Sequence, residues 1–132
     1  MLVDHDSMNL PPAIAGIPIR ALTWDDFKGT PPEDSPYVAH IYWSINYQFT
    51  TCKEGKKPRL KVQVGVRPKS WRVKEELKLL RHEYGHYLIG CLCALAFLKR
   101  TSHDFKDPKI SYPDWYKQVL AACLKEYCAM ER

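Results

Sequence analysis

Two histidines and a glutamate in the stretch RHEYGH have the spacing of a metal-binding motif. His82 and His86 are four residues apart, and Glu83 follows the first histidine directly. On a helix, both imidazoles project from one face about one turn apart, where both can bind a single tetrahedral Zn²⁺. Glu83 would lie beside them, and its carboxylate can take a proton from a metal-activated water and pass it to a leaving amine. The spacing predicts His82 and His86 as zinc ligands and Glu83 as the general base of peptide-bond hydrolysis.

A catalytic zinc site normally needs a third protein ligand, which the motif does not supply. The residues three and six positions beyond His86 are Ile89 and Leu92, so the H-x-x-G-x-x-H extension of one protease class is absent. Glu126 is the first candidate, because it falls within an apolar stripe of the last predicted helix, where a carboxylate is costly unless it meets a cation. That cation could equally be a lysine, and His103, in a polar loop, is the alternative ligand. We therefore predict a site of two histidines and Glu126, with His103 left open.

The motif must be positioned by other elements, and the first of these is a predicted β-hairpin. From Tyr37 to Thr50 apolar residues alternate with mostly polar ones, which predicts one long strand with a single buried face. The alternation resumes from Leu60 to Val66 after a turn-rich stretch, so the two runs predict an antiparallel pair. His40 falls on the polar face and is expected to be exposed, with a position lining the cleft as the alternative. Residues 1–36 are rich in proline, which predicts a mostly irregular segment.

Two helices are predicted to follow the hairpin. The helical period holds from Val73 to Lys99, with apolar residues on two opposite faces, which predicts a helix buried on both sides. Gly90, one turn beyond His86, would let another element approach closely, and we expect this to be the second helix, which opens at Pro113. The predicted fold is α+β, with a small antiparallel sheet packed on a long motif-bearing helix and a C-terminal helix after it. We expect a single domain over residues 1–132. Tyrosines near the motif that could stabilise an oxyanion are Tyr87, Tyr112, Tyr116 and Tyr127.

Composition limits the other functions. Of the 132 residues, 45% are hydrophobic and 27% charged, which argues against disorder. The net charge is +5, and the basic cluster Lys53–Lys61 is interpreted as a solvated hairpin end, so no nucleic-acid partner is expected. No apolar run approaches the roughly 20 residues of a membrane span, and no export signal is visible in the first ten residues. The five cysteines have no paired C-x-x-C spacing and do not predict a disulfide framework.

Two blocks of sequence carry a family resemblance. The stretch LTWDDFKGTPPEDSPYVAHIYWSINYQF, residues 22–49, followed by LLRHEYGHYLIG, residues 79–90, resembles the bacterial family of secreted zinc-dependent proteases whose function is otherwise unknown. The likeness covers roughly Ile17 to Phe97. It implies a zincin-like metallopeptidase, in which His82 and His86 match the metal ligands and Glu83 matches the base.

The resemblance also implies a substrate and a location. It suggests a periplasmic or secreted hydrolase acting on a peptide or protein substrate. The order of a hairpin, a motif helix and a later helix with an inward glutamate also resembles the smallest glutamate-zincin domains, which implies an edge strand that lines the cleft and pairs with an extended substrate. Members usually continue beyond the last helix into a segment with a histidine that could supply the third ligand, whereas the present chain ends at Arg132. Two functions therefore stay open. One is a zinc metallopeptidase, and the other is a non-catalytic zincin-like binding module that still holds a metal.

Overall fold

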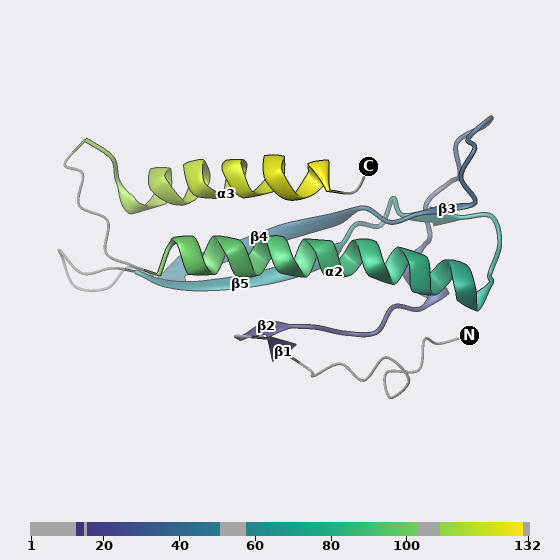
Figure 1. Cartoon of the computed structure of the whole chain (residues 1–132), viewed down its shortest axis with the longest axis horizontal. Helices are drawn as coiled ribbons and strands as arrows, with labels where there is room; N and C mark the ends of the chain where they lie inside the picture. The colour runs from purple at the N-terminus through teal and green to yellow at the C-terminus, as the bar shows by residue number, and fades with distance from the viewer. Residues whose placement is uncertain (1–12, 15, 51–57, 103–108, 131–132) are drawn as a thin grey trace.

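An antiparallel hairpin, two helices and several short strands make up the computed structural model (Figure 1). The structure describes residues 13–14, 16–50, 58–102 and 109–130. In chain order the elements are β1 (Ala13–Ile14), β2 (Ile17–Pro18), a 3-10 turn (Trp24–Asp26), β3 (Ala39–His40), β4 (Trp43–Thr50), β5 (Arg59–Val66), β6 (Trp71–Arg72), α2 (Leu77–Arg100) and α3 (Tyr112–Ala129). The predicted α+β class is confirmed. Within the described residues, no helix has the length and hydrophobicity needed to cross a bilayer.

The hairpin is confirmed, but the long strand predicted from Tyr37 to Thr50 is divided. Strand β4 pairs with β5 from Trp43 opposite Val66 onwards, whereas β3 pairs with β6. The break falls at Ile41 and Tyr42, whose backbone N–H groups leave the ladder. The Ile41 N–H donates to the Glu83 carboxylate at 2.7 Å, and the Tyr42 N–H donates to the Ser70 hydroxyl at 2.9 Å. Tertiary hydrogen bonds therefore replace sheet pairing at this point.

Helix α2 begins four residues later than predicted. Residues 71–72 form β6, and the Val73 N–H donates to the Val38 carbonyl at 2.8 Å, so this part of the chain is extended. Helix α3 begins as predicted, with Pro113 in its first turn and the Ser111 hydroxyl accepting from the Asp114 N–H at 3.3 Å.

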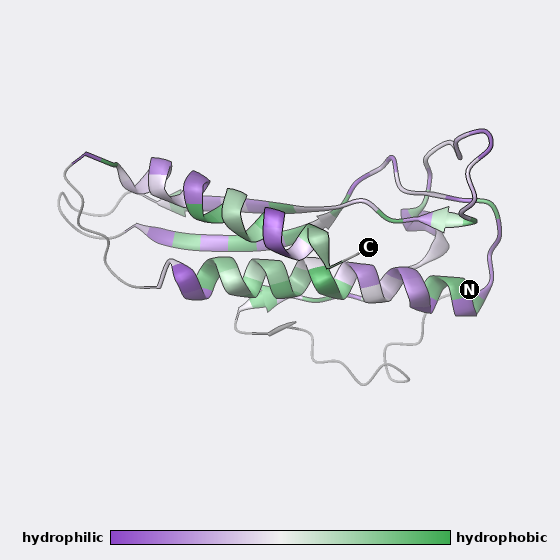
Figure 2. Ribbon diagram, turned by 45° about the horizontal axis from the view of Figure 1, so that its top comes forward, coloured by the Kyte–Doolittle hydropathy of each residue, from purple (hydrophilic) through white to green (hydrophobic). Residues whose placement is uncertain are grey.

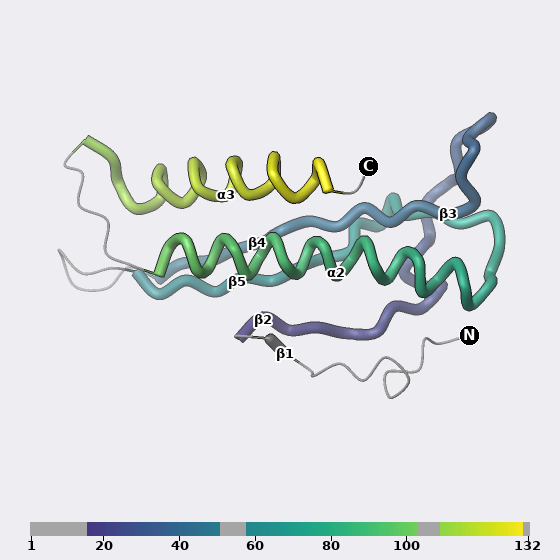
Figure 3. The backbone as a smooth tube through the Cα atoms, viewed as in Figure 1, coloured from purple at the N-terminus to yellow at the C-terminus, as the bar shows by residue number. Residues whose placement is uncertain are grey.

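Helix α2 lies between α3 on one side and the N-terminal segment with β2 on the other (Figure 3). Its two halves contribute to different hydrophobic clusters. Leu80, Tyr84 and Tyr87 pack with the N-terminal segment, whereas Phe97 packs with the hairpin and α3. The hydropathy colouring shows hydrophobic residues concentrated towards the middle of α2 and largely hydrophilic ones in its first turns (Figure 2). Burial on two sides is thus confirmed.

The close approach at Gly90 involves a different partner from the one predicted. A Cβ atom on Gly90 would lie 2.7 Å from the Trp43 indole, on strand β4. The strand, rather than α3, therefore occupies the space that the missing side chain leaves. The proline-rich N-terminal segment forms part of the hydrophobic core, because Leu22, Trp24 and Phe27 are almost fully buried.

Candidate metal centre

The two motif histidines lie at a separation that suits a shared metal ion. The Nε2 atoms of His82 and His86 are 3.3 Å apart. Two nitrogen ligands at about 2.0–2.1 Å from a tetrahedral Zn²⁺ would be separated by roughly 3.3–3.4 Å. The distance between the two nitrogen atoms is therefore compatible with one shared ion. In the metal-free protein the same spacing allows one imidazole to donate a hydrogen bond to the other.

Glu83 is anchored by one carboxylate oxygen and directed towards the histidines by the other. Its side chain is only 6% exposed, whereas that of His82 is 69% exposed. Oε1 accepts the hydrogen bond from the Ile41 N–H, and Oε2 lies 4.0 Å from His82 Nε2. Burial of a carboxylate is tolerated when it accepts such a bond. The anchor therefore leaves Oε2 as the carboxylate oxygen nearer to His82.

These three residues line a cleft of about 260 Å³ between α2 and the segment that leads into β3. The opposite wall consists of Pro36, Tyr37, Val38, Ala39 and His40, and Leu79 lies beside the motif on the helix. His40 is therefore half-buried in the cleft wall, whereas the strand pattern predicted an exposed position. Alternation along a strand defines the face of a residue, but it does not reveal which element lies opposite that face.

The tyrosines proposed from the sequence lie elsewhere. Tyr87 and Tyr116 are buried in the two hydrophobic clusters, and Tyr127 lines a separate hollow on the far half of α2. Tyr37, which sequence reasoning did not select, lines the cleft and is 65% exposed. Burial raises the pKa of Tyr87 to about 12. This buried phenol does not line the cleft, so it is no candidate for the oxyanion-stabilising hydroxyl.

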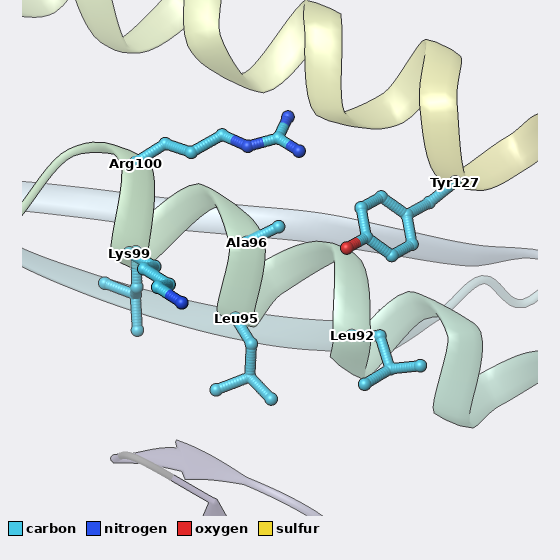
Figure 4. A pocket seen from close by; sticks show the side chains of 7 residues that line it. Leu92, Leu95, Ala96, Lys99, Arg100 and Tyr127 are labelled. Atoms are coloured by element: carbon cyan, nitrogen blue, oxygen red, sulfur yellow. The ribbon is translucent and has the colours of Figure 1, made fainter.

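Glu126 does not join the histidines. It forms an ion pair with Arg100 at 2.8 Å. Arg100 is the last residue of α2, fourteen residues after His86 and so about 21 Å further along the helix axis. Figure 4 shows Arg100 extending from this end of α2 in the hollow that Tyr127 also lines. The Glu126 side chain is 53% exposed and pairs with an arginine rather than with a metal, so the structure corrects the prediction of Glu126 as the third ligand.

The third ligand is not found among the described residues. Among these residues, one group of at least three metal-ligating side chains has ligand atoms within 4.8 Å of one another. It consists of His82, Glu83 and His86. His103, the alternative, lies outside the described residues. Lys53, Lys56 and Lys57 of the basic cluster also lie outside the described residues. A third ligand, and the interpretation of that cluster, stay predictions.

Comparison with known proteins yields no match to a family model, a curated protein or a solved structure. The resemblance to secreted zinc-dependent proteases consequently stays a prediction from two sequence blocks. What supports a function is the geometry of the cleft.

Proposed function

We propose that this protein is a zinc-dependent metallopeptidase that hydrolyses a peptide or protein substrate in the cleft beside α2. One observation carries the proposal. The imidazoles of His82 and His86 lie at the spacing of two ligands of one tetrahedral ion, and the free oxygen of an anchored glutamate lies beside them. An ordinary surface helix has no need to bury a carboxylate between a strand amide and an imidazole.

The histidines and the glutamate have different roles in the proposed reaction. His82 and His86 would hold the ion, which when bound would lower the pKa of a water and polarise a carbonyl. Glu83 Oε2 accepts a proton from the water as the water oxygen attacks the carbonyl carbon. The same oxygen would then return the proton to the amide nitrogen as the C–N bond breaks, which yields a carboxylic acid and an amine; the acid then loses its proton to solvent near neutral pH. Throughout, the Ile41 N–H keeps Oε1 in place.

The cleft wall favours an extended substrate. Residues 36–40 run along one side of a cleft whose volume of about 260 Å³ suits a short length of chain. Tyr37, Val38 and Leu79 give that cleft a partly apolar surface. We expect the side chain next to the cleaved bond to be apolar.

The test combines metal analysis with a glutamate substitution that preserves the anchor. Purified protein is assayed for bound zinc by mass spectrometry of the metal, and for cleavage of fluorescently labelled casein. Glu83→Gln keeps a carbonyl oxygen for the Ile41 N–H but cannot accept a proton, so zinc should be retained and cleavage lost. Equal cleavage by wild type and Glu83→Gln would exclude Glu83 as the base.

A second candidate is a binding module that holds the metal without catalysis. The observation in its favour is that, among the described residues, only two imidazoles and one anchored carboxylate meet at the site. Such a module would bind zinc at one equivalent and show no cleavage that depends on Glu83. The same assay therefore separates the two candidates.

A further inference from the structure

His40 faces the motif from the opposite wall of the cleft. It belongs to β3, and it lines the same cavity as His82, Glu83 and His86. Of the lining residues outside the motif, only His40 and Tyr37 have side-chain groups that can donate a hydrogen bond. Tyr37 is 65% exposed, whereas His40 is half-buried. His40 is thus the more enclosed donor on that wall.

The imidazole of His40 is held by aromatic neighbours. Its ring packs edge-on against Tyr42, with centroids 4.4 Å apart, and it stacks on Trp71 at 6.4 Å. Pairing of β3 with β6 places His40 opposite Trp71 in the backbone ladder as well. A ring fixed in this way by packing loses little freedom when it contacts a ligand.

The position of His40 is also coupled to that of Glu83. The peptide unit that joins His40 to Ile41 supplies the N–H that anchors Glu83 Oε1 at 2.7 Å. One peptide unit therefore sets the place of the base and of the imidazole together. Strand β3 would otherwise continue its ladder here, so the break at Ile41 creates this arrangement.

We propose that His40 is a further catalytic residue of this site and that its ring N–H donates a hydrogen bond to the carbonyl oxygen under attack. The inference rests on the proposed function. That oxygen gains negative charge as the water adds, and a donor at about 2.7–3.1 Å from it lowers the barrier. A donor suits the position better than a metal ligand does, because His40 is not part of the group whose ligand atoms lie within 4.8 Å of one another.

The chemical class recognised by His40 is a tetrahedral oxyanion, so a simple phosphonate is a suitable probe. The full chain is loaded with Co²⁺, whose visible absorption reports both metal binding and a change in its ligands, and is titrated with methylphosphonate. His40→Phe keeps an aromatic ring between Tyr42 and Trp71 but removes the donor, and His40→Ala serves if the phenyl ring does not fit. His40→Asn restores a donor.

We expect His40→Phe to bind Co²⁺ with the wild-type dissociation constant and methylphosphonate about tenfold more weakly, the loss of one hydrogen bond to an anion. His40→Asn should recover most of the affinity. Unchanged phosphonate binding in His40→Phe, or a wild type that takes up Co²⁺ but no phosphonate, would overturn the inference and leave the metal site intact. Weaker Co²⁺ binding in His40→Phe would make His40 a ligand instead. A wild type that binds no Co²⁺ would overturn the proposed metal site and this inference together.

Discussion

The two halves of α2 differ in what surrounds their polar groups. In the first half, His82 is exposed at a cleft and Glu83 is buried against a strand amide. In the second half, Cys93 and Phe97 are buried among apolar neighbours, and the charged residue at its end, Arg100, forms an ion pair at the surface. A buried carboxylate with an oxygen facing a cleft indicates a site, whereas a surface ion pair does not. The proposed metal site therefore lies in the first half, while both halves contribute buried side chains to the hydrophobic clusters.

The largest expected effect concerns metal affinity. His82→Ala or His86→Ala removes one of two imidazoles that meet at 3.3 Å, and we expect zinc affinity to fall by at least about 100-fold. Because the His82 side chain is 69% exposed, the thermal stability of metal-free His82→Ala should equal that of wild type. Titration with a chromophoric zinc indicator measures the affinity. Undiminished zinc binding by both variants would remove the assignment of function to the first half.

Matched substitutions of two glycines, one in each half of α2, test how closely each half is packed. A Cβ at Gly90 would meet the Trp43 ring at 2.7 Å, so Gly90→Ala should destabilise the fold by about 1–3 kcal/mol. Gly85, between the motif histidines, has no atom within 4 Å of such a Cβ. Gly85→Ala should therefore stabilise the protein by roughly 0.5–1 kcal/mol through helix propensity. Urea unfolding followed by tryptophan fluorescence measures both. Equal effects would show that the second half is not packed as closely as the structure has it.

Ser70 links the strand break to the site and predicts a mixed effect. Its buried hydroxyl accepts from the Tyr42 N–H at 2.9 Å, next to the peptide that anchors Glu83. Ser70→Ala should cost about 1–2 kcal/mol of stability, because it leaves that N–H unpaired. If the break positions Glu83, the kcat of casein cleavage should fall while zinc affinity is kept. Ser102→Ala is the control, since its hydroxyl contacts the Lys99 carbonyl at an exposed position. A Ser70→Ala variant with full kcat would show that the break acts on folding alone.

Local patterns in the sequence predicted the hairpin, the two helices and the motif, but not the division of the long strand or the short strand β6. The hairpin, the two helices and the pairing of His82 with His86 depend on residues close together in the chain, so period and spacing predict them. The division of the long strand depends on Glu83, which lies 42 residues from the amide that it binds. The periodicity of hydrophobic residues along the chain carries no information on a contact between residues so far apart in sequence. Likewise, the place of His40 in the cleft required the direction in which α2 crosses β3.

The error over Glu126 has a related cause. Its position in an apolar stripe predicted a buried carboxylate that needs a cation, but the Glu126 side chain is 53% exposed and its pair with Arg100 lies at the surface. A long side chain at the last turn of a helix reaches far enough to meet the neighbouring helix. An apolar stripe in the sequence therefore does not establish that a polar residue within it is buried, because burial depends on how α3 packs on α2.

The smallest expected effect follows from this ion pair. Both side chains are about half exposed, 42% for Arg100 and 53% for Glu126, and pairs of this kind contribute little because water screens them. Glu126→Gln should leave zinc affinity, cleavage and the midpoint of thermal unfolding unchanged within error. Arg100→Gln and the double variant, measured in the same way, complete a double-mutant cycle. A loss of zinc affinity in Glu126→Gln alone would require α3 to bring Glu126 to the histidines in the metal-bound protein. The difference between the two halves of α2 would then hold only without metal.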